Sequence, residues 1–359
     1  MEMKFDIAVI GAGPAGSAAA IVAARRGFNT VLFEAGSYPR HKVCGEFVSA
    51  EAADVLRFLV PNQADLLLDA PRVHRSRLHY RGRTTELKID PPAYSIPRYV
   101  LDESLWRAAA DHGVNCVRAS VENVSTEAEC TLTTSAGEYR VASVVNASGK
   151  WSRLNQEIRG DPWLGLKAHY RGEADDAVDL YFYGGGYCGV QSLGNGLLNA
   201  CALVKQGTAR TLNDVFACDA DLRARSRNWR AITETYATAP VYLGMGSLTR
   251  GEILQAGDAA GFVDPFVGDG ISLALRSGVL AGANVGVPAA EYRRFYTEAF
   301  GGIFRSARTA RTLLESSEAS RSLSVAAMRF PPVANWVMRR TRKSRLDVLE
   351  LATASIGCV

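Results

Sequence analysis

The feature that most constrains the fold is a glycine-rich run near the start of the chain, IAVIGAGPAG from Ile7 to Gly16. A short apolar stretch leads into three glycines, and an alanine-rich stretch typical of a helix follows. In such a unit the glycines permit a tight turn, a close approach of pyrophosphate to the backbone, and close packing of helix on strand. The helix N-terminus offers free N–H groups to the phosphates. The expected dinucleotide loop comprises Gly11, Gly13, Pro14, Ala15 and Gly16.

An acid follows the second predicted strand, Thr30–Phe33, at Glu34. A carboxylate in this position accepts hydrogen bonds from a ribose 2′-OH and repels a 2′-phosphate. We therefore expect Glu34 and Ala35 to contact an adenosine diphosphate without a 2′-phosphate, as in FAD or NAD. The alternative is a glycine-rich turn with no ligand, and the presence of strand, helix and acid in register argues against it.

A second glycine-rich region, residues 252–275, favours FAD over NAD. Ile253–Gln255 is predicted to be a buried strand, and a carboxylate follows it where it can bind the hydroxyls of a ribityl chain. A turn then leads into another helix, whose N-terminus suits the edge of a flavin that becomes negative on reduction. An NAD enzyme needs no such second site. The residues assigned to it are Gly257, Asp258, Pro265, Gly268, Gly270 and Ile271.

Five motifs in this order resemble the FAD-dependent family that includes aromatic hydroxylase flavin monooxygenases, geranylgeranyl reductases and flavin-dependent halogenases. Besides the two glycine-rich regions they are PRHKVCGE at Pro39–Glu46, Arg98 with Leu101-Asp102, and NASGKWSR at Asn146–Arg153. The resemblance covers nearly the whole chain. It implies an α/β fold, Rossmann-like and FAD-binding, of the two-domain hydroxylase type, with an antiparallel sheet in the substrate domain and C-terminal helices.

The domain organisation expected from this pattern is discontinuous. The FAD-binding domain is predicted over residues 1–75, 96–160 and 245–285, the substrate-binding domain over 76–95 and 161–244, and a helical region over 286–359. Alternating apolar residues predict four antiparallel strands within 161–204, a β-meander over 122–142 and a return to the main sheet over 143–147. Helices are predicted over 101–111 and from 289 onward, with a break at Pro331-Pro332.

The resemblance also implies further cofactor contacts. Arg40 is expected near the phosphates or ribose of FAD, Cys44-Gly45 near an edge of the flavin, and Arg98 at the phosphates or the flavin chain. Cys44 could form a covalent flavin bond, act as a redox thiol or fill a tight space, and the last is favoured because nothing in the sequence would lower the pKa of its thiol. The other contacts implied are Val121, through its backbone, and Ser148-Gly149.

Candidates for chemistry lie on alternate positions of the substrate-domain strands, because the inner face of that sheet lines the substrate cavity in the family. They are His169, Tyr187, Lys167 and Gln191. Of these four residues, His169 is the best suited to general acid–base catalysis at neutral pH. A lone histidine on a sheet is nonetheless more often a structural hydrogen-bonding group. Glu46 is a further candidate for the proton donor, but we favour the interpretation that it is a solvated carboxylate on a loop.

Two departures from the family pattern bear on the reaction. Halogenases carry W-x-W-x-I-P and geranylgeranyl reductases Y-x-W-x-F-P where this chain reads YCGVQS, with Gly189 at the indole position. Ser148 replaces the aspartate that the resemblance connects with FAD and NADPH binding. We expect a monooxygenase or hydroxylase acting on a hydrophobic or aromatic small molecule with NADPH or NADH. The alternatives are a geranylgeranyl-reductase-like enzyme that reduces or desaturates C–C bonds and a flavin-carrying electron-transfer protein.

Composition sets the remaining expectations. The 359 residues, 47% of them apolar, suffice for a sizeable core, and no apolar run is long enough to cross a bilayer. The first predicted strand begins near Lys4 and leaves no room for a cleavable signal. Seven cysteines without a C-x-x-C pair or metal-ligand spacing predict a cytoplasmic protein with no metal site.

The net charge of +4 is mild, and the only dense basic cluster is RRTRKSR at Arg339–Arg345. Such a cluster could contact an acidic carrier protein, a membrane surface or nucleic acid, while a solvated helix end is the favoured interpretation. A separate reductase is a further possible partner. We expect no nucleic-acid partner.

Overall fold

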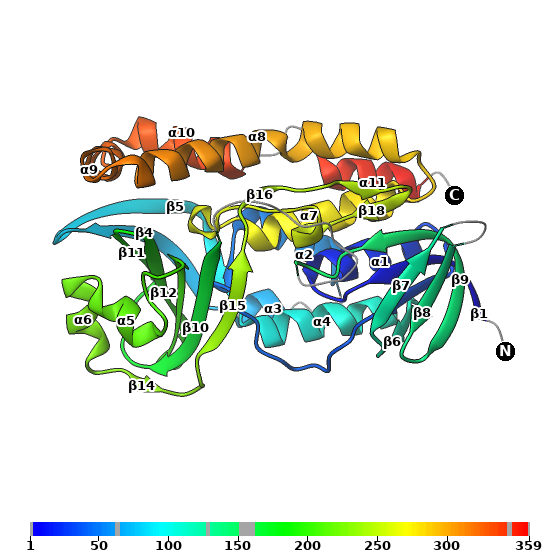
Figure 1. The fold of residues 1–359 in the computed structure, drawn as a ribbon, viewed down its shortest axis with the longest axis horizontal. Helices are drawn as coiled ribbons and strands as arrows, with labels where there is room; N and C mark the ends of the chain where they lie inside the picture. Colours follow the sequence, from blue (N-terminus) through cyan, green and yellow to red (C-terminus); the bar gives the residue numbers. More distant parts are fainter. Residues whose placement is uncertain (1–2, 62–64, 127–129, 151–161, 343–346, 358–359) are drawn as a thin grey trace.

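The computed structural model describes residues 3–61, 65–126, 130–150, 162–342 and 347–357. Two β-sheets lie side by side, and a layer of C-terminal helices covers both (Figure 1). The first sheet has the strand order β17-β18-β9-β1-β2-β6, with β7 and β8 attached beside β9. Its strands are β1 (Met3–Ile10), β2 (Thr30–Phe33), β6 (Asn115–Val117), β7 (Val121–Ser125), β8 (Cys130–Thr134), β9 (Gly137–Asn146), β17 (Thr249–Arg250) and β18 (Ile253–Gln255).

The centre of this sheet is parallel, since β1 pairs in parallel with β2 and β9, β2 with β6, and β18 with β9. Strand β2, with the sequence TVLF, is buried at all four positions. Such continuous burial is typical of parallel strands that have helices or a second layer on both faces. The parallel Rossmann-like sheet expected from the sequence is therefore confirmed.

Helices α1 (Pro14–Arg25) and α7 (Gly270–Ala283) pack unusually closely against the first sheet and each other. A Cβ atom on Gly278 would lie 2.0 Å from the carbonyl oxygen of Ala15, and one on Gly282 would lie 2.5 Å from that of Ala19. These successive contacts show that the helices run parallel. At 1.5 Å per residue, the N-terminus of α7 projects roughly 10 Å beyond that of α1 in the same direction.

The second sheet has the order β14-β10-β13-β12-β11-β4-β5-β3, with β15 also on β10. Its strands are β3 (Phe47–Val48), β4 (Arg72–Tyr80), β5 (Arg83–Ser95), β10 (Trp163–Arg171), β11 (Ala177–Tyr183), β12 (Gly186–Gly194), β13 (Leu197–Lys205), β14 (Arg230–Ala231) and β15 (Tyr236–Val241). Helices α5 (Leu212–Ala217) and α6 (Ala220–Ser226) cover its outer face and bury an apolar cluster there. The inner face is turned toward the first sheet and the C-terminal helices.

Helix α8 (Ala289–Ser316) spans the two sheets. Near its start the hydroxyl of Tyr292 donates to the carbonyl oxygen of Gln255 in β18, at 2.6 Å, and near its end Arg311 reaches the second sheet at Trp163. The remaining elements are α2 (Ala50–Leu59), α3 (Asp65–Leu68), α4 (Arg98–Asp111), β16 (Gly244–Met245), β19 (Gly261–Phe262), α9 (Glu318–Ala327), α10 (Pro331–Arg342), α11 (Val348–Ile356) and the 3₁₀ turns η1 (Gly257–Ala259) and η2 (Pro265–Val267).

The four antiparallel strands expected within residues 161–204 are confirmed as β10 to β13. The expected meander is confirmed as β7, β8 and the first part of β9, and the return to the main sheet is the end of that same strand, which runs unbroken over Gly137–Asn146 and pairs with β1. The break expected at Pro331-Pro332 is also confirmed, because α9 ends at Ala327 and α10 begins at Pro331, a position that proline tolerates. A further break, which was not expected, lies at Ser317, whose hydroxyl caps α9. The expected domain boundaries stay a prediction, and β3 with the first residues of β4 joins the second sheet.

Candidate functional site

The glycine loop between β1 and α1 has no room for side chains at two positions. Gly11 has φ +91°, and a Cβ atom there would lie 2.6 Å from the carbonyl oxygen of Ala147. A Cβ atom on Gly16 would lie 1.7 Å from the carbonyl oxygen of Gly11. Any larger residue would therefore displace the loop or the helix, which explains the spacing of these glycines physically.

Two cations face Gly13, the second glycine of the loop. The position a Cβ atom would take on Gly13 lies 3.7 Å from Lys42 Nζ and 3.9 Å from a terminal nitrogen of Arg98. Asp102, which is fully buried, pairs with both: its carboxylate is 2.8 Å from Lys42 Nζ and 2.8 Å from Arg98 Nε. Burial opposes the charge on Arg98, but Asp102 holds the pKa of Arg98 above its ordinary value. Two cations and one carboxylate leave a net positive charge beside free N–H groups, which fits a diphosphate.

The acid predicted to bind ribose is already engaged by the backbone. Glu34 is 5% exposed and accepts hydrogen bonds from the N–H groups of Ala12 at 3.1 Å and Gly36 at 2.9 Å. Arg40 pairs with the same carboxylate at 2.6 Å. Arg40 therefore lies at the ribose end of the loop rather than beside Lys42 and Arg98. Val121 begins β7, on the strand pair β7–β8 that extends from β9.

The second glycine-rich region forms a turn directly in front of α7. Gly257 has φ +61° and a Cβ atom there would meet Ala15 at 2.7 Å, so this turn touches α1. Gly268, at φ +69°, ends η2, and α7 begins at Gly270. The two helix starts expected from the sequence thus lie in one region. The turn also carries Asp264, which is buried and paired with Arg311 of α8; burial raises the pKa of Asp264 to about 6 although Arg311 opposes the shift.

A lysine that the sequence analysis did not single out lies beside this turn. Lys150 Nζ is 2.9 Å from the centre of the Phe262 ring and 3.9 Å from a carboxylate oxygen of Asp258. Burial lowers the pKa of Lys150 to about 8, and Asp258 opposes that shift. Ser148 turns back to Asn146, to which its N–H and hydroxyl donate at 3.2 and 2.5 Å. The neighbouring Gly149 has φ +77°, and Arg153 of the same motif lies outside the described residues.

A buried acid–base cluster joins the PRHKVCGE segment to the second sheet. Glu46 is fully buried and its carboxylate is 2.5 Å from Lys167 Nζ and 2.8 Å from His169 Nε2, both on β10. The same carboxylate accepts the backbone N–H of Arg98 at 2.8 Å. The expectation of a solvated loop carboxylate at Glu46 was therefore wrong. Sequence separation hid the pairing, because the partners are more than 120 residues apart.

Cys44 and Gly45 are held against the sheet by their backbone. The side-chain amide of Asn199 on β13 donates to the carbonyl oxygens of Cys44 at 3.0 Å and Gly45 at 2.8 Å. The sulfur of Cys44 accepts the N–H of Glu46 at 3.3 Å. His41, earlier in the segment, stacks on Tyr236 with ring centres 5.0 Å apart and meets His169 edge-on at the same distance. The whole segment is thus fixed between the phosphate loop and the second sheet.

The inner face of the second sheet carries the other predicted residues. His169, Asn199 and Gln191 stand opposite one another on β10, β13 and β12. The side-chain nitrogen of Gln191 is buried and finds no hydrogen-bond partner among the described residues. Gly189 lies two residues before Gln191 on β12. Among the described residues, Leu180 and Cys201 lie near the position that a Cβ atom would take on Gly189, at 3.4 and 3.7 Å.

Tyr187 belongs to an apolar cluster that reaches the turn before α7. Its ring centre is 5.8 Å from that of Phe182 and 6.2 Å from that of Phe266 in η2. Burial raises the pKa of Tyr187 well above its ordinary value, and Asp264 adds to the shift. The phenol therefore keeps its proton at neutral pH.

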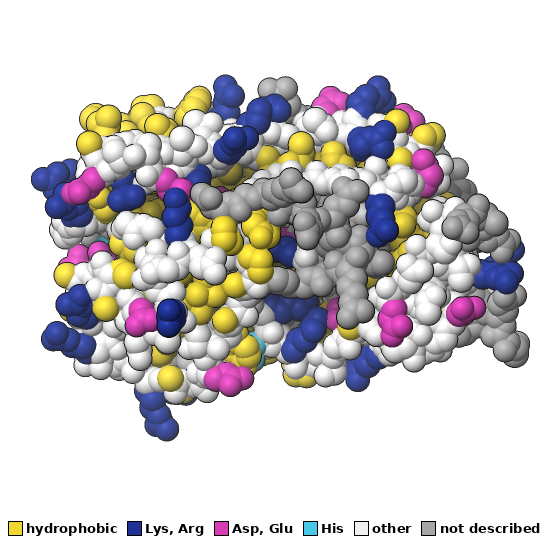
Figure 2. All heavy atoms as spheres, viewed as in Figure 1, with side chains coloured by type: hydrophobic (Ala, Val, Ile, Leu, Met, Phe, Trp, Pro, Cys, Tyr) yellow, Lys and Arg dark blue, Asp and Glu magenta, His cyan; other side chains and the backbone are white. Residues whose placement is uncertain are grey.

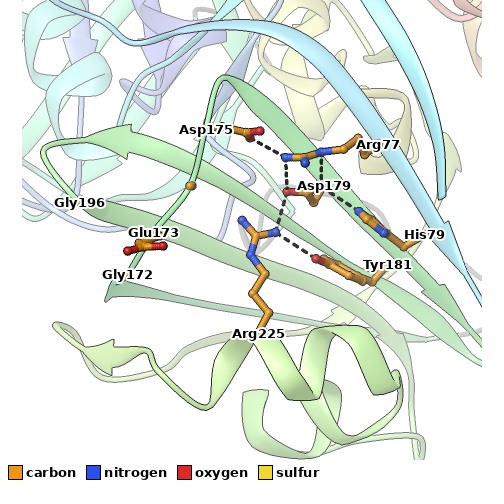
Figure 3. A pocket seen from close by; sticks show the side chains of 10 residues that line it. Arg77, His79, Gly172, Glu173, Asp175, Asp179, Tyr181, Gly196 and Arg225 are labelled. Carbon is orange, nitrogen blue, oxygen red and sulfur yellow. Dashed lines mark hydrogen bonds and ion pairs between the residues drawn. The ribbon is translucent and has the colours of Figure 1, made fainter. Parts of the chain in front are cut away.

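A separate hollow of about 750 Å³ lies on the outer face of the second sheet (Figure 3). There Arg77, His79 and Arg225 point at one buried carboxylate, Asp179, with His79 Nε2 at 2.8 Å and Arg225 at 2.6 Å. Because side chains alternate along β11, Asp179 is turned away from Leu180 and the inner face. The hollow contains none of the predicted site residues, and its charges satisfy one another.

Two buried carboxylates predict acid sensitivity. Burial opposes ionisation of Glu46, but His169 and Lys167 outweigh it and lower the pKa of Glu46 from its ordinary value of 4.5. Burial likewise opposes ionisation of Asp179, but His79 and the two arginines lower its pKa from the ordinary value of 3.8. A carboxyl group whose pKa is lower in the folded state than in the unfolded state stabilises the fold at pH values above its unfolded-state pKa. This stabilisation is lost as the pH falls through the folded-state pKa. The free energy of unfolding, measured with urea from neutral to acidic pH, should therefore fall below a pH of about 4.5. A value that stays flat would contradict both assignments.

Comparisons with known proteins agree with this geometry. Residues 6–53 match the family model for FAD dependent oxidoreductases. Menaquinone reductase of Mycolicibacterium smegmatis is 28% identical over 321 residues, covering 78% of this chain and 76% of the relative. Digeranylgeranylglycerophospholipid reductase 1 of Methanococcoides burtonii is 25% identical, covering 79% and 74%. The structure of flavin-dependent brominase Bmp2 superposes with a TM-score of 0.80 at 19% identity, covering 94% of this chain and 93% of that one.

The fold and the paired helix starts define a flavoprotein with a parallel Rossmann-like sheet and an antiparallel sheet. The chain is an FAD-dependent oxidoreductase related to menaquinone and geranylgeranyl reductases and to flavin-dependent halogenases. Among the described helices, none combines the length and the apolar character needed to span a bilayer. The described residues also contain no group of three or more His, Cys, Asp or Glu side chains placed to hold a metal ion.

Proposed function

We propose that this chain is a reductase that uses FAD to saturate a carbon–carbon double bond in the polyprenyl part of a quinone or lipid. The observation that carries the proposal is the apolar cluster of Tyr187, Phe182 and Phe266, which joins the inner face of the second sheet to the turn before α7. A polyprenyl chain is apolar throughout and suits such a surface. The names of the menaquinone and digeranylgeranylglycerophospholipid reductases support this choice over hydroxylation.

The residues that would hold FAD follow from the geometry. The loop of Gly11, Gly13 and Gly16 with Lys42 and Arg98 would bind the diphosphate, and Glu34 the adenosine ribose. Asp258 would bind the ribityl chain, and the N-terminus of α7 the flavin edge that gains negative charge. When bound, the cofactor supplies the electron pair that reduces the double bond. NADPH or NADH is the proposed source of those electrons.

The protein must supply one proton to the substrate, and we assign it to Tyr187. Its ring lies against Phe266 of the turn that would meet the flavin. Lys167 and His169 are instead held by Glu46, at 2.5 and 2.8 Å. Their proposed role is to position the segment that contains Cys44 and Gly45, a role different from the chemistry first expected of them.

The test is a product analysis with purified, FAD-loaded protein. Under anaerobic conditions with NADPH, NADH or dithionite as reductant, a menaquinone or geranylgeranyl lipid should yield a product that is heavier by one H2 in mass spectrometry after any quinol has been reoxidised to the quinone. Tyr187→Phe should lower the rate by about 100-fold with FAD still bound, since general acid catalysis contributes on this scale. An oxygenated product that forms only in air would overturn the proposal in favour of a monooxygenase.

The space beside Gly189 offers a second check. Gly189→Trp should lower turnover by about 100-fold without releasing FAD, because the described neighbours of this position, Leu180 and Cys201, are packed around a glycine in this chain, so that an added indole would project onto the face that the substrate must reach. Gly189→Ala is the matched control, since contacts of 3.4 and 3.7 Å to a Cβ atom are ordinary van der Waals distances. Equal turnover of the tryptophan and alanine variants, measured by product formation, would contradict the assignment of this face.

A further inference from the structure

The C-terminal helices expose large apolar side chains along one surface, here named the α9–α10 patch. Figure 2 shows hydrophobic side chains gathered over α9 and α10, at the upper left of the view. The patch consists of Leu323 (72% exposed), Phe330 (67%), Val333 (38%) and Trp336 (59%). Leu323 lies on α9, Phe330 in the joint between the helices, and Val333 and Trp336 about one turn apart on α10. Large side chains so exposed and so close together mark an interaction surface.

The patch lies in a basic stretch of the sequence that follows Glu318, the first residue of α9. Between Glu318 and Asp347 there is no acidic residue, whereas seven basic residues occur there: Arg321, Arg329, Arg339, Arg340, Arg342, Lys343 and Arg345. Arg329 and Arg340 are exposed, and the guanidinium carbon of Arg340 is 5.3 Å from the Trp336 ring centre. Apolar and aromatic side chains bordered by arginine are typical of helices that lie in a membrane interface.

The opposite side of α9 faces the candidate site. Val325 is buried in the apolar cluster that contains Tyr187, and Met328 packs on the same cluster with Phe266. Helix α9 therefore carries exposed apolar residues on one side and touches the proposed substrate surface with the other. Beside it, α10 contacts η2, the turn that precedes α7.

We propose that the α9–α10 patch docks on the surface of an anionic lipid bilayer. Leu323, Phe330 and Trp336 enter the interface between headgroups and acyl chains, and the exposed Arg329 and Arg340 contact lipid phosphates. The proposal that the chain docks on a bilayer depends only on the observations about the α9–α10 patch. The further step, that the bilayer delivers an apolar substrate to the cluster beneath α9, rests on the proposed function.

A second copy of the chain fits the patch less well. In a two-fold dimer the same surface meets itself, so the exposed Arg329 and Arg340 of one copy would lie near those of the other. An anionic lipid surface has the opposite charge and removes this repulsion.

The experiment is sedimentation of the full, FAD-loaded chain with vesicles. It should sediment with phosphatidylcholine–phosphatidylglycerol vesicles, less with phosphatidylcholine alone, and less in high salt. The variant Leu323→Ser/Phe330→Ser/Trp336→Ser should lower the partition coefficient by about tenfold or more, because burial of each such side chain is worth at least this factor. Leu68→Ser is the matched control, since Leu68 is 73% exposed on α3, away from the C-terminal helices.

Three results would overturn the proposal: no sedimentation with anionic vesicles, equal loss for the triple variant and Leu68→Ser, or a concentration-dependent dimer in light scattering that the triple variant abolishes. The assay contains no substrate, so its outcome is independent of the reaction. Turnover of a detergent-dispersed substrate, expected to be unchanged in the triple variant, reports separately on the proposed function.

Discussion

Gly278→Ala is expected to destabilise the protein by about 3 kcal/mol, toward the upper end of the cost of overpacking a core. The new Cβ atom would lie 2.0 Å from the carbonyl oxygen of Ala15, and backbone cannot move aside as a flexible side chain can. Ala15 also belongs to the phosphate loop, so separating α1 from α7 should weaken FAD binding by about tenfold or more. Urea unfolding and a fluorescence titration with FAD measure the two effects.

The matched control is Gly302→Ala in α8. This glycine is also helical, but none of the described residues has an atom within 4 Å of the position of its Cβ atom, apart from its own neighbours in the helix. Alanine there should stabilise the protein by about 1 kcal/mol through helix propensity, with FAD binding unchanged. If the two variants behaved alike, close packing between α1 and α7 would not be what Gly278 provides.

Glu46→Gln is the second change for which we expect a large effect, a loss of about 3–5 kcal/mol of stability. The amide is similar in size, but it removes the charge opposite Lys167, whose side chain is fully buried and 2.5 Å from the carboxylate. An uncompensated buried ammonium accounts for most of that cost. Because Glu46 also accepts the N–H of Arg98, FAD affinity should fall with stability. Equilibrium unfolding at neutral pH and FAD titration test both.

The control for this change is the double variant Glu46→Gln/Lys167→Met, which removes both charges. It should regain most of the stability lost by Glu46→Gln, because no unpaired charge stays buried, and it should lose part of the acid sensitivity of the wild type. A double variant as unstable as Glu46→Gln would show that the hydrogen bonds of Glu46, rather than its charge, hold the segment.

The sequence predicted what depends on local spacing. The glycines at 11, 13 and 16, the strand before Glu34 and the four strands of the second sheet follow from patterns within a few residues of each other, and the structure has these elements. The pairing of α1 with α7 was accessible only through the expectation that both serve one cofactor. Family resemblance, more than periodicity, supplied that link.

The ion pairs of the site could not be predicted because they join distant segments. Nothing near Glu46 indicates that Lys167 and His169 will neutralise it, so a loop carboxylate was the reasonable expectation. The same holds for Lys42 with Asp102, and for Lys150 beside Phe262. These pairings depend on how the two sheets are placed relative to each other, and that placement is a property of the whole packed chain.

The pairing of Asp264 with Arg311 also fixes the order in which the site can be completed during synthesis. Asp264 precedes η2 and α7, whereas its partner lies 47 residues later, in α8. A growing chain that has left the ribosome only as far as α7 already contains both sheets and the phosphate loop, but this carboxylate still lacks its cation. The flavin end of the site is therefore finished after the nucleotide end, once α8 has been translated.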